Sequence, residues 1–266
     1  MKISIVTVCY NEEKNIAKTI ESVLNQTSNS FEYIICDGKS ADKTVEIAKT
    51  YAVKFKEKGV EYRVYSERDG SIYAGMNNGI DRATGDYVIF INAGDKLNYE
   101  DAIKNVIEAV GNNSPHVIYG NSLYVDMCVC SVFDTCHKDL ERGMTLAHPA
   151  TLVRSDVIKS HKFDTSFKIA ADYNMMLTLY QENCEFLKVD VIISNFYADG
   201  ISSINRCASA SESCRVRRLH GIDCNEEQEL IQAKKIERKL KLKNRIPKFI
   251  RKLWSKTIKK RQWIEE

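Results

Sequence analysis

The sequence lacks long apolar runs and stretches rich in helix-breaking residues. No apolar run approaches the roughly 20 residues that cross a bilayer, and the 266 residues include only 3 prolines and 12 glycines. The apolar segment at residues 3–9 follows the first Met and Lys without a signal-peptide pattern. We therefore expect a cytosolic globular protein, built either as one large α/β domain with an extension or as two small domains.

Nine cysteines are present, but their spacing does not indicate a zinc site or a disulfide framework. The number is odd, no Cys-x-x-Cys occurs, and Cys128 and Cys130 are separated by one residue. Cysteines of cytosolic proteins normally stay reduced. We expect free thiols, with residues such as Cys9 and Cys36 packed as small apolar side chains.

Two common phosphate-binding loops are also missing. A dinucleotide-binding domain needs a glycine-rich turn after its first strand, whereas the first expected strand here runs into Tyr10-Asn11-Glu12. The P-loop pattern that ends in Gly-Lys-Ser/Thr does not occur either. The chain must therefore hold any phosphate ligand by other means.

The first 110 residues alternate between strand and helix patterns about every 25 to 30 residues. The expected strands are Ile3–Cys9, Tyr33–Cys36, Tyr62–Ser66 and Tyr87–Ile91, and apolar residues recur at helical spacing between them. This alternation is typical of βαβ units and a parallel sheet. It weakens afterwards, where we expect short strands Val117–Tyr119 and Leu123–Val125, a helix Asp172–Glu182 and a late strand Val189–Phe196.

Acidic residues follow the expected strands. Glu12, Asp37, Asp69 and Asp95 each come just after one of them. Because parallel sheets bind ligands beyond the carboxyl ends of their strands, these side chains are expected at one edge. Such a set suits a divalent cation with a diphosphate, together with the base and ribose of a nucleotide. Asp37 could instead serve only as a turn residue, and Asp95 only as a turn or helix-capping residue.

Several motifs resemble the family-2 glycosyltransferases, in particular bacterial polysaccharide and O-antigen enzymes. They are Val6–Glu12, Ser22–Thr27, Tyr33–Thr44, Ser66–Ile80 and Ala83–Asp86. The similarity is dense over residues 3–100 and patchy to about residue 203. It implies an α/β GT-A fold, with a mostly parallel nucleotide-binding sheet flanked by helices and a mixed acceptor-binding half. The corresponding ranges are residues 1–110 and 111–208 of a domain spanning 1–208, before a helical basic extension at 209–266.

The resemblance also implies roles in donor binding. Thr7, Tyr10 and Glu12 would line the nucleoside pocket, with Tyr10 able to stack on the base. Asp37 would accept a hydrogen bond from the uracil ring, and Asp69 would lie near the ribose or the donor sugar.

The remaining roles concern the cation, the base and the acceptor. Asp95 stands at the metal position of the family, whereas Asn92 replaces a frequent acid, so we expect weakly held Mn²⁺ or Mg²⁺. Asp172 matches the general base of an inverting transfer, although Ala171 precedes it where the family usually has Glu. His148 matches a position near the acceptor site.

A basic segment ends the chain. Residues 234–261 contain 14 Lys or Arg and one acid, which gives this segment a net charge of +13. Because the whole chain has a formal net charge of +3, the other residues together carry about −10. Ile250, Leu253, Trp254 and Ile258 fall at helical spacing among these charges. We expect this segment to bind an anionic membrane surface, with a solvated tail as the alternative. The acidic body and the lack of a nucleic-acid motif argue against nucleic acid.

Together these features predict an inverting hexosyl- or N-acetylhexosaminyltransferase at the inner face of the cell membrane. It would transfer a sugar from a UDP-sugar to a lipid-linked glycan in bacterial surface polysaccharide synthesis. The alternatives are a sugar-phosphate nucleotidyltransferase, whose glycine-rich loop is missing here, and a non-catalytic nucleotide-sugar-binding relative. The sequence specifies neither the sugars nor the oligomeric state.

Overall fold

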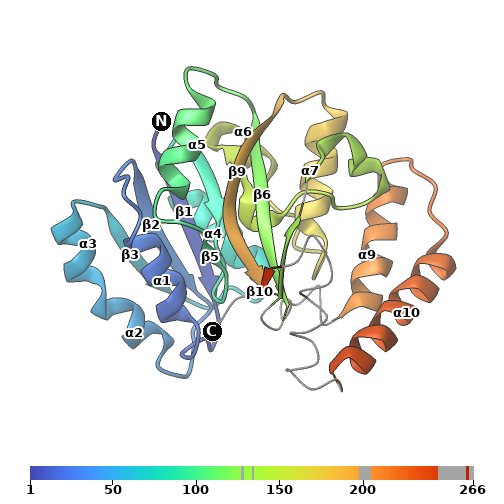
Figure 1. Cartoon of the computed structure of the whole chain (residues 1–266), viewed down its shortest axis with the longest axis horizontal. Helices are drawn as coiled ribbons and strands as arrows, with labels where there is room; N and C mark the ends of the chain where they lie inside the picture. Colours follow the sequence, from blue (N-terminus) through green and yellow to red (C-terminus); the bar gives the residue numbers. More distant parts are fainter. Residues whose placement is uncertain (127–128, 134, 198–204, 245–261, 264–266) are drawn as a thin grey trace.

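The computed structural model describes residues 1–126, 129–133, 135–197, 205–244 and 262–263 (Figure 1). The strands are β1 Ile3–Cys9, β2 Phe31–Asp37, β3 Tyr62–Ser66, β4 Tyr87–Phe90, β5 Lys96–Leu97, β6 Val117–Asp126, β7 Val129–Phe133, β8 Thr151–Arg154, β9 Phe186–Tyr197 and β10 Gln262–Trp263. The α-helices are α1 Ile16–Leu24, α2 Thr44–Thr50, α3 Ala52–Lys58, α4 Ile72–Arg82, α5 Ala102–Val110, α6 Ser155–His161, α7 Ala171–Gln181, α9 Arg206–Leu219 and α10 Glu226–Asn244. Two 3₁₀ segments are η1 His137–Arg142 and η2 His148–Ala150.

The first half of the chain forms the expected parallel part of the sheet. In the order β4–β1–β2–β3, each strand runs parallel to its neighbour. Cys9 at the end of β1 pairs with Asp37 at the end of β2, and Val6 pairs with Phe90 at the end of β4. The loops that follow these strands therefore leave the sheet at the same edge.

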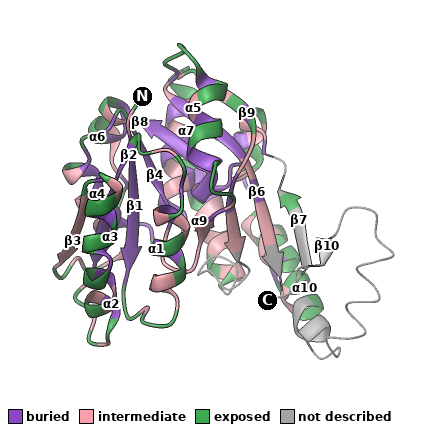
Figure 2. Cartoon of the chain, turned by 60° about the vertical axis from the view of Figure 1, so that its left-hand side comes forward, coloured by how far each residue is buried: buried purple, intermediate pink, exposed green. Residues whose placement is uncertain are grey.

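Apolar cores lie on both faces of the sheet (Figure 2). On one face, Ile3 and Ile5 of β1 belong to a core with side chains from α1, α2, α3 and α5. On the other face, Val6 and Val8 belong to a core with side chains from α4, α6, α7 and α9. Burial on both faces explains why β4 is a continuous apolar run and why every residue of β1 is buried.

Two glycines let α4 approach β1 closely. A Cβ at Gly79 would lie 2.5 Å from Cγ1 of Val6, and one at Gly75 would lie 2.8 Å from Cγ1 of Val8. Real Cβ atoms do not approach other atoms so closely, so larger residues would push α4 away from the sheet.

The second half continues the same sheet with mixed strand directions. Strand β8, which the sequence analysis did not predict, lies antiparallel between β4 and β6. The two short strands expected near residue 120 are one strand, β6, with register shifts against β9 around Asn121. A Cβ at Gly120 would lie 2.6 Å from the carbonyl oxygen of Val191, so glycine permits the close approach there.

The cysteine prediction is wrong for one pair. Cys214 on α9 and Cys224 just before α10 form a disulfide, with their Cα atoms 5.5 Å apart. Cys9 and Cys36 are free and buried, as expected. The sequence does not indicate this pair, because the two cysteines lie ten positions apart in a polar segment without a recognised spacing pattern.

The basic end of the chain is described only in part. The apolar positions expected to contact a membrane, from Ile250 to Ile258, lie outside the described residues. Among the helices that the structure describes, none combines the length and the apolar character needed to cross a membrane.

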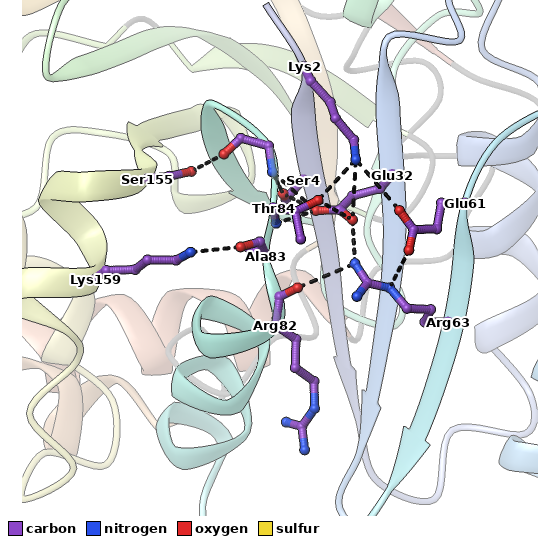
Figure 3. A network of polar contacts seen from close by, with 11 residues as sticks. Lys2, Ser4, Glu32, Glu61, Arg63, Arg82, Ala83, Thr84, Ser155 and Lys159 are labelled. Atoms are coloured by element: carbon purple, nitrogen blue, oxygen red, sulfur yellow. Dashed lines mark hydrogen bonds and ion pairs between the residues drawn. The ribbon is translucent and has the colours of Figure 1, made fainter.

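A buried carboxylate joins the strands at the edge opposite their carboxyl ends (Figure 3). The side chain of Glu32 on β2 is fully buried and accepts hydrogen bonds from Ser4 Oγ, at 2.6 Å, and from the backbone N–H groups of Thr84 and Gly85, at 2.6 and 3.2 Å. It also forms an ion pair with Arg63 of β3. Burial alone would raise the pKa of Glu32, but these hydrogen bonds and the Arg63 charge lower it below its ordinary value.

The same network reaches α6 in the second half of the chain. Lys159 Nζ donates to the carbonyl of Ala83 at 2.8 Å, and Ser155 Oγ donates to the carbonyl of Gly85 at 2.5 Å. The turn at residues 83–85, which Glu32 holds, is therefore fixed from both sides.

Replacing Glu32 with Gln is expected to lower the free energy of unfolding by about 3 kcal/mol, because Arg63 loses its buried partner. Because the pKa of Glu32 is lowered in the folded state, its contribution to the free energy of unfolding is complete above pH ~4.5. This contribution is lost as the pH falls further. Urea denaturation between pH 3 and 7 measures both effects, and the difference between wild type and variant should shrink toward pH 3.

The matched control is Glu61→Gln, which removes a half-exposed carboxylate that also faces Arg63. Surface ion pairs contribute little, so its effect should stay within about 0.5 kcal/mol. Equal effects of the two substitutions at all pH values would contradict the role given to Glu32.

Candidate active site

A cavity of about 750 Å³ lies where the loops after β1, β3 and β4 meet the loops before β8 and α7. Residues from both halves of the chain line it. Seven of the nine predicted site residues are among them: Tyr10, Glu12, Asp69, Asn92, Asp95, His148 and Asp172. The structure thus brings together acids that are far apart in the sequence, as the parallel register requires.

Thr7 and Asp37 do not line the cavity. Thr7 is fully buried, and its hydroxyl donates to the carbonyl of Ile91 at 2.6 Å, so it joins β1 to the chain after β4. The Asp37 carboxylate is almost fully buried and accepts hydrogen bonds from the Ser40 backbone N–H at 3.0 Å and from Ser66 Oγ at 2.6 Å. Both side chains fix the strand ends beneath the cavity; contact between Asp37 and a uracil ring stays a prediction.

Asp69 lies against two glycines. A Cβ at Gly75 would lie 2.6 Å from its Oδ2, and one at Gly38 would lie 3.1 Å from its Oδ1. Burial is the main cause that raises the pKa of Asp69, and the nearby charge of Asp37 acts in the same direction. The fit between helix α4 and the loop after β2 therefore determines where this carboxylate lies.

The turn after β4 presents oxygen atoms to the cavity. Gly94 has a φ of +105°, and Thr19 holds the turn by accepting from the Gly94 N–H at 3.0 Å and donating to the Asp95 carbonyl at 2.8 Å. The Oδ1 atom of Asn92 is buried and has no hydrogen-bond partner among the described residues. An unpartnered amide oxygen beside a carboxylate fits a hard divalent cation.

The protein offers few ligands for such a cation. In the described part of the chain, no group of three or more His, Cys, Asp and Glu side chains is arranged to hold a metal. Asn92 and Asp95 would therefore need oxygens from another molecule, such as a diphosphate, to complete the coordination of a cation.

Asp172 lines the cavity from the second half of the chain. Its Oδ1 accepts from the Tyr173 N–H at 2.8 Å and lies 3.2 Å from the Tyr73 hydroxyl, which donates to the Ile169 carbonyl at 2.5 Å. Its Oδ2 lies 3.8 Å from Nδ1 of His148. The carboxylate is held in place yet about a fifth exposed, as a proton acceptor for a bound molecule must be.

His148 is stacked on Phe90, with ring centroids 5.4 Å apart. Burial lowers the pKa of His148, although the charge of Asp172 acts in the opposite direction. Its Nε2 is buried without a hydrogen-bond partner among the described residues. Burial thus favours the neutral form of this ring, which lies next to the candidate base.

The cavity residues that were not predicted as site residues include Arg68, Tyr73, Lys168 and Phe196. Arg68 and Tyr73 lie within the motif at residues 66–80 and could have been proposed from it. Lys168 occurs in a segment without a recognisable pattern. Phe196 ends the expected late strand Val189–Phe196, but a strand pattern alone does not indicate a contact with the cavity.

The comparison with known proteins identifies a family. The model of glycosyl transferase family 2 matches residues 4–133, which confirms the predicted resemblance. A PGL/p-HBAD biosynthesis glycosyltransferase of Mycobacterium bovis is 31% identical over 119 residues, which cover 44% of this chain and 45% of the relative. The match thus spans less than half the length of that relative.

Solved structures share the fold over more of the chain. S. aureus TarS 1-349 in complex with UDP-GlcNAc has a TM-score of 0.66 at 20% identity, covering 86% of this chain and 69% of that one. The mannosyltransferase PcManGT from Pyrobaculum calidifontis, in complex with GDP-Man and Mn²⁺, has a TM-score of 0.64 at 12% identity, covering 88% of this chain and 68% of that one. These likenesses confirm the expected GT-A fold.

Because the protein offers few ligands for the cation, we expect cation binding and diphosphate binding to depend on each other. Mn²⁺ should raise the thermal shift caused by UDP, because a ligand selective for the folded state stabilises it in proportion to its affinity. The Asp95→Ala variant should lose this effect of Mn²⁺, with at least a tenfold weaker apparent affinity for the cation.

Glu100→Ala, which removes a nearby exposed acid, is the matched control and should behave as wild type. A UDP thermal shift that is equal with and without Mn²⁺ in the unmodified protein would contradict the cation assignment.

Proposed function

We propose, from the glycosyl transferase family 2 region at residues 4–133, that this chain is an inverting glycosyltransferase. It transfers a hexosyl or N-acetylhexosaminyl group from a UDP-sugar to a hydroxyl group of a glycan. The observation that carries the proposal is the single cavity in which acids of the nucleotide half, Glu12, Asp69 and Asp95, face the same space as Asp172. The UDP-GlcNAc complex of the similar TarS structure supports UDP as the nucleotide.

The reaction requires one displacement at the anomeric carbon. The acceptor oxygen forms a bond to this carbon while the bond to the diphosphate oxygen breaks, and its electron pair leaves with UDP. The Asp172 carboxylate takes the proton of the acceptor hydroxyl. The transition state has oxocarbenium character, as in glycoside hydrolysis, so attack from the opposite face inverts the anomeric configuration.

Other cavity residues bind and orient the two substrates. Tyr10 is 62% exposed and would stack on the base. Asp69 lines the cavity and would accept hydrogen bonds from the ribose or the donor sugar. Asn92 and Asp95 would hold Mn²⁺ or Mg²⁺, which supplies charge neutralisation for the departing diphosphate when bound. The neutral His148 ring stands beside Asp172 on the acceptor side.

Asp172→Asn is expected to lower kcat by about 10²- to 10⁴-fold, because the amide cannot accept the acceptor proton. The UDP thermal shift should persist, since Asp172 belongs to the acceptor side. Transfer or donor hydrolysis is measured across UDP-, GDP- and CDP-sugars with Mn²⁺.

The matched control, Asp190→Asn, changes an exposed acid on β9 and should keep wild-type turnover. If Asp172→Asn turned over normally while it bound the donor, another residue would be the base. Pyrophosphate release from a nucleoside triphosphate would instead favour a nucleotidyltransferase.

We also propose that the acceptor is lipid-linked, that the product belongs to a bacterial surface polysaccharide, and that the protein works at the cytoplasmic face of the membrane. The support is the basic composition of residues 234–261, because anionic lipid attracts each nearby Lys or Arg by about 1 kcal/mol.

Flotation with liposomes tests this location. Binding should require anionic lipid, weaken with salt, and fall when several Lys and Arg in residues 245–261 are replaced by Gln. Equal flotation of this variant and the unmodified protein would contradict the membrane proposal.

A further inference from the structure

Glu212, on helix α9, contacts the loop that carries the proposed base. Its Oε2 accepts hydrogen bonds from the backbone N–H groups of Ile169 and Ala170 at 2.8 and 2.9 Å. The N–H of Lys168 lies 2.9 Å from Oε1 and 3.1 Å from Oε2. One carboxylate thus satisfies three consecutive backbone donors ahead of α7.

These donors need a partner for two physical reasons. The first N–H groups of a helix and of the turn before it have no acceptor within the helix. The N-terminal end of α7 also carries partial positive charge, which a carboxylate stabilises. Charge-assisted hydrogen bonds of this kind are shorter and stronger than neutral ones. Glu212 therefore fixes the backbone of residues 168–170 more firmly than a neutral side chain would.

The loop held by Glu212 is part of the cavity wall. Lys168, Ile169 and Asp172 all line the cavity. On its other side, the Ile169 carbonyl accepts from the Tyr73 hydroxyl, which also lies 3.2 Å from Oδ1 of Asp172. The loop is thus held between Glu212 from outside and Tyr73 from the nucleotide half, with Asp172 directly after it.

Helix α9 is itself firmly attached. Val216 is fully buried in the core shared with α4 and α7. The Cys214–Cys224 disulfide fixes the segment between α9 and α10. These contacts provide a rigid support from which Glu212 can position the loop.

We infer that Glu212 is a positioning residue for the transfer reaction, acting through the loop at residues 168–170 to hold Asp172 at the acceptor hydroxyl. The inference rests on the proposed function. It gives a positioning role to a helix outside residues 4–133, the part that matches the family model. Because displacement of a reacting group by about 1 Å can cost 10²-fold in rate, a loosened loop should lower kcat strongly.

The test compares Glu212→Ala, Glu212→Gln and the control Glu226→Ala. Glu226→Ala removes the hydrogen bonds that Glu226 of α10 accepts from Ser211 and Arg218 of α9. It leaves Glu212 bonded to the three backbone N–H groups of the loop. Glu212→Ala should lower kcat by about 10- to 100-fold with less than a threefold change in KM for the donor. Glu212→Gln keeps one acceptor oxygen and should recover much of that loss, whereas Glu226→Ala should keep wild-type kcat.

Hydrogen exchange supplies a readout that does not depend on turnover. The amides of residues 168–170 should exchange faster in Glu212→Ala, to a smaller extent in Glu212→Gln, and at the wild-type rate in Glu226→Ala. If Glu212→Ala does not fold, the isosteric Glu212→Gln carries the test, with a several-fold lower kcat and faster exchange than wild type expected.

Two failures can be told apart. If the unmodified protein transfers or hydrolyses no nucleotide sugar, the proposed function fails and this inference fails with it. If the unmodified protein is active but both Glu212 variants keep its kcat, or if the loop amides exchange at the same rate in all proteins, only the role of Glu212 is refuted.

Discussion

The parallel pairing of β1 with β2 and β4 is the constraint on which the site depends. The register joins Cys9 to Asp37 and Val6 to Phe90, so the loops with Glu12, Asp69 and Asp95 leave the sheet on one side. A shift by one residue would turn buried side chains toward the opposite face. At the other edge of the sheet, the buried Glu32 carboxylate connects β1, β2 and β3 with the turn before β4.

The second half of the chain completes the cavity because it extends the same sheet. Strand β8 pairs with both β4 and β6, and η2 immediately before it places His148 on Phe90. Helix α7 presents Asp172 from the same half, and α9 holds the loop in front of α7 through Glu212. Residues of both halves therefore line one cavity.

Much of the first half of the chain could be predicted because its strands are apolar and regularly spaced. Strands Ile3–Cys9 and Tyr62–Ser66 have the expected bounds, and most of the acids placed after strands line the cavity. The resemblance implied that Thr7 lines the nucleoside pocket, but its side chain is fully buried and does not line the cavity. In this strand its hydroxyl satisfies a backbone carbonyl in the core.

The second half of the chain was harder to predict for physical reasons. Strand β8 has four residues and follows a His-Pro turn, too short for a periodic signal. The Cys214–Cys224 bond and the contacts of Glu212 join side chains to partners that no spacing rule relates. Glu212 binds backbone N–H groups, which every residue except proline offers, so its sequence position carries no trace of this role.

The central claim is that one displacement, assisted by one carboxylate, occurs in this cavity. The most direct test is the anomeric configuration of the sugar transferred or released from an α-linked UDP-sugar, followed by NMR before the anomers equilibrate. The account predicts that the first product is the β-anomer. A product that retains the α-configuration would contradict it, because retention requires a second displacement or attack from the same face.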